Sequence, residues 1–161
     1  MPVNGRHKGK RAMKFVCEYL KKIYPDLSFE RNLKNRSGDI FTTTDFPFVV
    51  EVKNQECWKF CHFFGPENRI YSHMAKFWQQ VNRDVKLLEK QSGVRKIPWL
   101  VFTKNREPYY FMFSRDDMGA DSYILLLKLS CPTLYIPRNR LVVFPALPAE
   151  KMRRFLASLT W

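Results

Sequence analysis

The sequence has few acidic residues and no long apolar run. The lack of a long apolar run bears on whether the protein spans a membrane. Without about 18 consecutive apolar residues, no segment is expected to span a membrane. Residues 1–14 are basic but lack the apolar stretch of a secretory signal. The few cysteines, Cys17, Cys57, Cys61 and Cys131, are scattered and are therefore expected to be reduced thiols. We expect a cytoplasmic protein with no membrane partner.

The shortage of acidic residues bears on the partner. Asp and Glu number 15 against 28 Lys and Arg, a formal net charge of +13. Nucleic acid is the natural partner of such a chain, because Lys and Arg displace counterions from its phosphates. The alternative is a basic protein that is merely soluble. The 161 residues and the apolar fraction of 45% suit one folded domain, 1–161, and argue against disorder.

Hydrophobic periodicity predicts helices and strands in a mixed order. A mobile basic arm is expected over 1–9, followed by a helix over 10–24 with an apolar stripe. A second helix is expected over 72–92, after a long connection over 55–72. The expected strands cover 27–33, 39–43, 47–54, 99–103 and 109–113. Edge strands are expected within 120–145, for example over 141–144, and a basic helix over 148–159.

The sequence Asp39-x11-Glu51-Val52-Lys53 is the strongest candidate for a site. Side chains two apart on a strand point to the same face, so Glu51 and Lys53 would lie side by side. If the strand with Asp39 pairs with this strand, two carboxylates and an ammonium group converge. Close carboxylates repel each other and favour a cation between them, as in a Mg²⁺ site. A metal beside a lysine suits attack on a phosphodiester.

The alternative for Glu51 and Lys53 is an exposed ion pair on a strand surface, which is common. Three features weigh against that alternative. The preceding Val49 and Val50 indicate a central strand, Asp39 follows Gly38 one hairpin upstream, and the basic composition points independently to a phosphate substrate.

The expected order is a helix, a strand, a strand with Asp39, a strand with Glu51 and Lys53, and a second helix. In this order the chain resembles the PD-(D/E)XK nucleases. Residues 8–114 look like the small phage and archaeal Holliday-junction-resolvase-like members. The resembling segments are Lys8-Gly9-Lys10-Arg11-Ala12, Gly38-Asp39, Val50-Glu51-Val52-Lys53, Gln80-x3-Asp84, 98–102 and Arg106-Glu107-Pro108-Tyr109. The resemblance implies an α/β (α+β) restriction-endonuclease-like αβββαβ core, a mixed central sheet flanked by helices. Residues 120–161 would then be a C-terminal extension.

The resemblance also implies roles for individual residues. Asp39 and Glu51 would ligate Mg²⁺ or Mn²⁺, with the Val52 carbonyl completing the protein ligands. Lys53 would orient the attacking water and stabilise the transition state. Gln80 would lie near the scissile phosphate, although a polar residue at the border of a buried helix face is the alternative.

One position departs from the resolvase pattern. A glutamate usually follows the Arg-Ala of the first helix, but this chain has Met13. Glu18 and Glu30 are the candidates to replace that ligand, although a solvated helix glutamate is the alternative for Glu18. The missing glutamate leaves open whether one metal or two bind.

Two further groups of residues were assigned from the sequence. Basic side chains near the proposed site are candidate phosphate contacts: Lys8, Lys10, Arg11, Lys34 and Arg36. Cys57, Cys61, His62 and His73 have the chemistry of a zinc site, but their spacing is not that of zinc knuckles. We expect these thiols to pack with aromatic rings beneath the loop instead.

The sequence therefore predicts a Mg²⁺-dependent DNA endonuclease, in the host cytoplasm if phage-encoded. Its expected substrate is branched or structured DNA. Cutting a junction in pairs implies a homodimer. The alternatives are a nicking or restriction-type nuclease and a non-catalytic nucleic-acid-binding protein on the same fold.

Overall fold

The computed structural model describes residues 5–32, 38–43, 45–63, 65, 70, 72–104, 106–129 and 132–159. Its main sheet has five strands in the order β3-β4-β5-β7-β6. These are β3 (Phe48–Asn54), β4 (Ile97–Thr103), β5 (Tyr110–Ser114), β7 (Leu141–Pro145) and β6 (Leu134–Ile136). β3 and β4 are parallel, and the other pairs are antiparallel. The predicted mixed sheet is confirmed.

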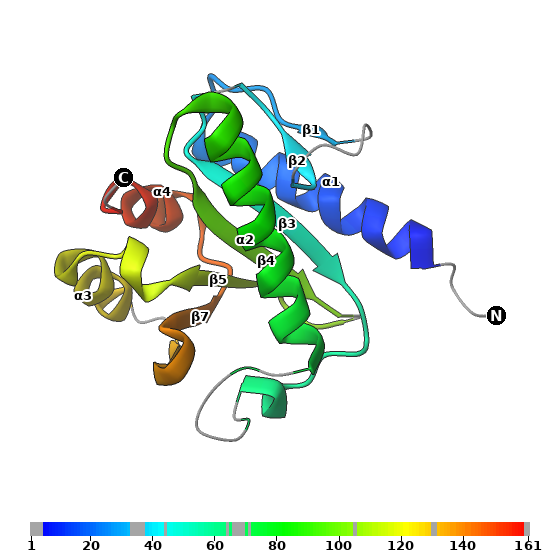
Figure 1. The fold of residues 1–161 in the computed structure, drawn as a ribbon, viewed down its shortest axis with the longest axis vertical. Coiled ribbons are helices and arrows are strands. Elements are labelled where there is room, and N and C mark those ends of the chain that lie inside the picture. Colours follow the sequence, from blue (N-terminus) through cyan, green and yellow to red (C-terminus); the bar gives the residue numbers. More distant parts are fainter. Residues whose placement is uncertain are drawn as a thin grey trace.

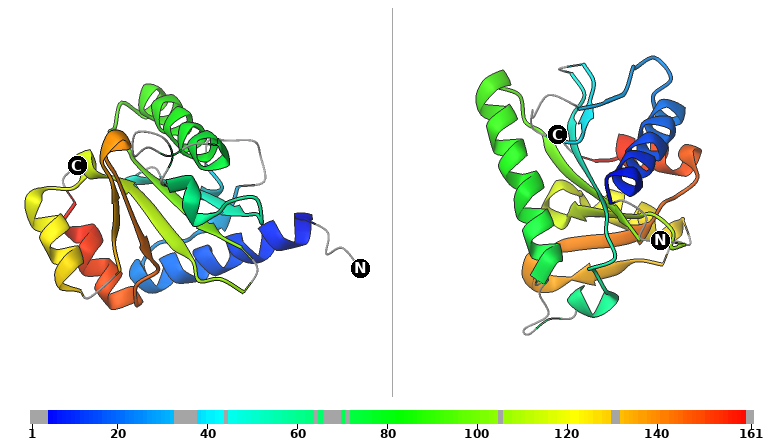
Figure 2. Two further views of the ribbon diagram at one scale, coloured as in Figure 1. Left: turned by 90° about the horizontal axis from the view of Figure 1, so that it is seen from below. Right: turned by 90° about the vertical axis from the view of Figure 1, so that its right-hand side faces the viewer.

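Helices cover both faces of this sheet (Figures 1 and 2). α2 (Ser72–Ser92) lies on one face. α1 (Gly5–Ile23) and α4 (Ala149–Ala157) lie on the other, and α3 (Ala120–Lys128) packs beside α4. β1 (Glu30–Arg31) and β2 (Ile40–Phe41) form a separate antiparallel pair. None of the described helices is long and apolar enough to cross a membrane.

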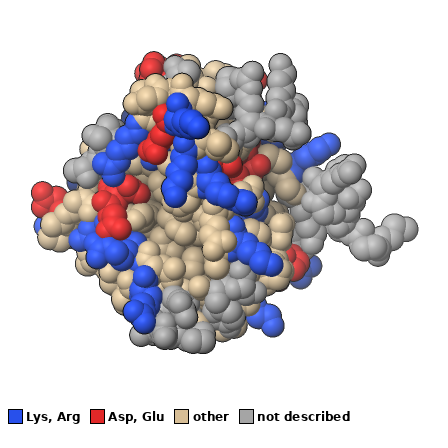
Figure 3. Space-filling model, in the orientation of Figure 1, with Lys and Arg blue, Asp and Glu red and all other residues tan. Residues whose placement is uncertain are grey.

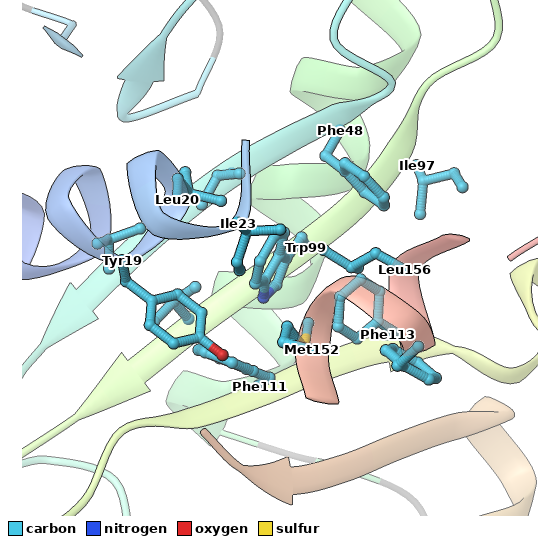
Figure 4. Close-up of a cluster of buried hydrophobic side chains, with 14 of the residues drawn as sticks. Tyr19, Leu20, Ile23, Phe48, Ile97, Trp99, Phe111, Phe113, Met152 and Leu156 are labelled. Atoms are coloured by element: carbon cyan, nitrogen blue, oxygen red, sulfur yellow. The ribbon is translucent and has the colours of Figure 1, made fainter. Parts of the chain in front are cut away.

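The side chains of α1, α4 and the sheet interlock in the larger of two apolar clusters (Figure 4). Trp99 is fully buried, with its ring centroid 5.2 Å from that of Phe113. Phe113 in turn lies 5.6 Å from Phe155 of α4. The smaller cluster, between the sheet and α2, contains Trp58 and Phe63 of the 55–72 connection. Apolar side chains therefore cover both faces of the sheet, and a polar residue on either face is an exception.

Four expectations about the elements were wrong. α1 begins at Gly5, so the predicted arm over 1–9 is helical from that residue. The three strands expected over 27–33, 39–43 and 47–54 do not form one sheet in the described residues, because β1 pairs with β2 and β3 pairs with β4. β3 lies at the edge of the five-stranded sheet, not at its centre. Residues 120–128 form α3, where edge strands were expected; β6 and β7 are strands as expected.

Candidate active site

The site lies on the face of β3 that α2 covers. Val50 and Val52 point into the cluster shared with α1, whereas Val49 points into the cluster shared with α2. Because side chains alternate along a strand, Glu51 and Lys53 also face α2. The predicted pairing of these two residues on one face therefore agrees with the packing of their neighbours.

Glu51 is held between two donors. The residue is 1% exposed, and its Oε1 accepts hydrogen bonds from Lys53 Nζ and, at 2.6 Å, from Gln80 Nε2 of α2. Lys53 Nζ also lies 5.6 Å from the centre of the Phe77 ring. The structure thus brings Glu51, Lys53 and Gln80 together as the sequence predicted.

Asp39 reaches the same place from the outer edge of β3. Its backbone N–H donates to the Val50 carbonyl at 2.9 Å. Its Oδ2 accepts from the Val52 N–H at 2.8 Å. Asp39 therefore hydrogen-bonds to the Val50 carbonyl and the Val52 N–H, which would otherwise be unpaired at the edge of the sheet. These bonds hold its carboxylate beside Glu51.

Gly38 permits this close approach. Its φ of +80° lies in the left-handed region, which favours glycine. A Cβ at this position would lie 3.1 Å from Val49 Cγ1. The Gly38 N–H donates to Oδ2 of Asp84 at 3.0 Å, so α2 holds the turn in place. The sequence contained Asp84 at a spacing of four from Gln80, which puts both on one helix side, but no role for it was predicted.

Burial disfavours the charge of both site carboxylates. Desolvation raises the pKa of Glu51 to about 7, and the Asp39 charge raises it further, whereas the charge and hydrogen bond of Lys53 lower it. Desolvation also raises the pKa of Asp39, against the Val52 hydrogen bond and Lys53. Two buried carboxylates with raised pKa values favour a bound cation or proton.

The donor set fits a hard divalent metal. In the described part of the chain, hydrogen bonds to these carboxylates reach only Oδ2 of Asp39 and Oε1 of Glu51. Oδ1 and Oε2 are open to a cation. Among described residues there is no group of three His, Cys, Asp or Glu suited to a metal. Two carboxylates and the Val52 carbonyl instead match Mg²⁺, which keeps several waters.

Glu18 and Glu30, the two candidates for the ligand missing at Met13, lie away from Asp39 and Glu51. Glu18 is mostly exposed and pairs with Lys14 at 3.8 Å. Glu30 lines a cavity between α1 and β1. Met13 packs against the cluster on the far side of the sheet from Glu51. The third carboxylate whose charge acts on Asp39 and Glu51 is Asp84.

Two of the predicted phosphate contacts lie in one basic cavity of about 570 Å³. Lys10 and Arg11 line it together with Lys14 and Arg31. The Lys8 side chain, Lys34 and Arg36 lie outside the described residues. A cationic cavity beside β1 agrees with the predicted role of Lys10 and Arg11, which stays a prediction.

The 55–72 connection packs against the sheet as expected at Cys57 and Trp58 but not at Cys61. Trp58 is buried, and its Nε1 donates to the Thr103 carbonyl at 3.1 Å. Cys57 packs at the border of the same cluster, while Cys61 is exposed as a free thiol. No zinc cluster forms among the described residues of this segment.

A mixed sheet with helices on both faces and a Glu-x-Lys strand beside an aspartate places this chain among PD-(D/E)XK nucleases. A family model described as "Phage putative PDDEXK endonuclease" matches residues 13–127. The chain belongs to that family, and the match includes Asp39, Glu51, Lys53 and Gln80. No curated protein and no solved structure matches the chain significantly.

Proposed function

We propose that this protein is a metal-dependent DNA endonuclease that hydrolyses phosphodiester bonds. The observation that carries the proposal is the convergence of Asp39, Glu51, Lys53 and Gln80 at the edge strand β3. Burying Glu51 beside another carboxylate is costly unless a cation binds there. Membership of a family of phage endonucleases agrees with this chemistry.

The proposed metal is Mg²⁺, with Mn²⁺ as a substitute, held by Asp39, Glu51 and the Val52 carbonyl. When bound, such an ion supplies a Lewis acid that neutralises phosphate charge and makes water more acidic. Asp39 and Glu51 keep their oxygens in place through the Val52 N–H and the Gln80 amide.

Lys53 and Gln80 supply the other functional groups. The Lys53 ammonium has three N–H donors and gives one to Glu51, so the others could donate to a phosphate oxygen or to the attacking water and stabilise the transition-state charge. Gln80 donates to Glu51 and so would hold that carboxylate in position. The family resemblance supports a further role for Gln80 near the scissile phosphate. Its location on α2 ties the carboxylate to a rigid element.

We further propose branched DNA as the substrate and a homodimer as the active form. The support is the resemblance of residues 8–114 to junction-resolving enzymes, together with the net charge of +13. A symmetric dimer would place two sites on the two strands that a junction requires to be cut. Light scattering coupled to gel filtration tests the dimer directly, and a monomeric mass with and without junction DNA would contradict it.

The test of substrate choice is a cleavage panel. Linear, nicked, flapped and four-way DNA are incubated with the protein in Mg²⁺, in Mn²⁺ and in EDTA. We expect metal-dependent cuts that favour the four-way or flapped substrate. Preference for nicked or linear DNA would identify a nicking or restriction-type enzyme. Binding without cleavage in both metals would identify a non-catalytic nucleic-acid-binding protein.

A further inference from the structure

A second basic hollow lies on the outer face of α2, apart from the residues predicted to contact DNA. It has a volume of about 560 Å³ and is lined by Lys76, Phe77, Gln79, Gln80, Arg83 and Lys86, among others. We call Lys76, Arg83 and Lys86 the α2 cations. All three are exposed. On the face drawn in Figure 3, Lys and Arg side chains gather over α2.

The α2 cations share one face of the helix. Lys76 and Arg83 are seven positions apart, as are Gln79 and Lys86, so these side chains form a stripe at the helical repeat. The stripe from Lys76 to Lys86 is about 15 Å long at the rise of an α-helix. That length matches about four nucleotides of one strand of B-DNA.

No carboxylate of α2 neutralises the positive charge of this stripe. The two carboxylates of α2 are both directed to backbone donors: Asp84 accepts from Gly38 at 3.0 Å, and Glu89 accepts from Lys96 at 2.8 Å. Within the described chain none of the α2 cations forms an ion pair. Arg83 and Lys86, and Lys86 and Lys90, are like charges one turn apart, which destabilises an isolated helix.

The hollow is continuous with the candidate active site. Gln80 lines the hollow and donates to Glu51, and Phe77 lines it while lying beneath the Lys53 ammonium. The right-hand view of Figure 2 places β3 between α2 and α1, so the cavity with Lys10 and Arg11 lies across that edge. A polyanion at Glu51 would therefore meet positive charge on both sides.

We propose that the α2 cations bind the phosphate backbone of the DNA substrate next to the scissile bond. This inference rests on the proposed endonuclease function and adds the surface that holds the substrate on the α2 side. The contacts are to phosphates and not to bases, so they contribute affinity without sequence preference.

The test compares two variants that lose the same charge. One is Lys76→Gln, Arg83→Gln, Lys86→Gln. The control is Lys128→Gln, Lys151→Gln, Arg154→Gln, which alters exposed cations of α3 and α4 on the other side of the molecule. Binding of fluorescent four-way and linear duplex DNA is measured in EDTA over a series of salt concentrations. Circular dichroism melting checks that both variants fold.

The α2 variant is expected to bind about 10-fold to 100-fold more weakly than the control near 0.15 M salt, because each lost phosphate contact removes a released counterion. Its plot of log affinity against log salt should be shallower by about 0.9 per lost contact. Equal affinities and slopes for the two variants, with wild-type protein that binds and cleaves, would overturn this inference alone. A wild-type protein that neither binds nor cleaves DNA would overturn the proposed function as well.

Discussion

Glu51 is the least exposed of the described charged residues, at 1%. It lies beside Asp39, and Asp84 adds a third negative charge nearby. Burying like charges costs free energy of folding, so this arrangement opposes stability while preparing a cation site. An apolar residue would pack better on this face of β3, so the cost agrees with the proposed role of Glu51 as a metal ligand.

The substitution Glu51→Gln should separate stability from metal binding. Without metal, the variant should unfold at the same temperature as wild type or higher, because a neutral amide removes the repulsion with Asp39. Mg²⁺ should raise the melting temperature of wild type and not that of the variant. At 100 times its Kd a ligand adds about 2.7 kcal/mol to the free energy of unfolding. Glu150→Gln, an exposed acid on α4, is the control. Equal Mg²⁺ shifts in all three proteins would contradict the assignment.

Gly38→Ala should disturb the placement of Asp39. The φ of +80° and the Cβ position 3.1 Å from Val49 Cγ1 both oppose a side chain. We expect a loss of about 1–2 kcal/mol from the backbone conformation, with an added loss from the contact. The matched control is Gly93→Ala, where φ is +70° but no atom lies within 4 Å. Urea unfolding measures both, and an equal loss would show that packing against β3 is unimportant.

At the scale of single elements, α2 is the clearest success of sequence reasoning. Its predicted bounds, 72–92, are those observed, because a stripe of Met74, Phe77, Val81 and Val85 repeats at helical spacing before Gly93. α3 was not predicted, because consecutive Ile and Leu residues obscure the helical spacing of apolar positions. Gly119 as the N-cap and Lys128 in the last turn were the available signals.

β3 illustrates what a hydrophobic run cannot specify. Val49 and Val50 indicate burial on both faces, which β3 has, and the prediction of a central strand followed from that burial. The number of neighbouring strands depends on pairing across the chain. Here Asp39 and Gly38 cover the free edge, so an edge strand is protected as a central one would be. The Asp-x11-Glu-x-Lys spacing predicted that the carboxylates converge, but not that Asp39 would do so by covering a free edge.

α2 should be needed to hold the Asp39 turn as well as to cover the sheet. Asp84→Ala leaves the buried Gly38 N–H without its acceptor, which should cost about 1–3 kcal/mol and weaken Mg²⁺ binding. Asp84→Asn keeps an acceptor oxygen and should lie close to wild type in both respects. Calorimetric titration of Mg²⁺ into each protein, beside urea unfolding, distinguishes the two variants. Unchanged Mg²⁺ affinity in Asp84→Ala would contradict a positioning role.

At the scale of the whole molecule, the C-terminal residues complete the fold that carries the site. β7 pairs with β5, and α4 supplies Met152, Phe155 and Leu156 to the cluster around Trp99. The sequence predicted edge strands within 120–145 but not their partners in this part of the chain. This part completes the sheet, which long-range pairing decides and local sequence does not.

Phe155→Ala should destabilise the entire protein. Its ring is fully buried, and its centroid lies 5.3 Å from that of the Phe144 ring and 5.6 Å from that of the Phe113 ring. Such a truncation costs about 3–5 kcal/mol in a core that cannot collapse. Tryptophan fluorescence and circular dichroism should report one shared transition at lower urea. An early transition seen by only one probe would indicate that α4 unfolds apart from the site.

The central claim is that Asp39, Glu51 and Lys53 form a metal-dependent phosphodiesterase site. Its most direct test is cleavage of four-way DNA with Mg²⁺ by wild type, by Lys53→Ala and by Lys59→Ala, a change of an exposed lysine on the following connection. We predict that wild type and Lys59→Ala cut only with metal. Lys53→Ala should bind the DNA but cut at least about 100-fold more slowly, the scale of losing one transition-state donor. Cleavage by Lys53→Ala at the wild-type rate, or by wild type in EDTA, would contradict the claim.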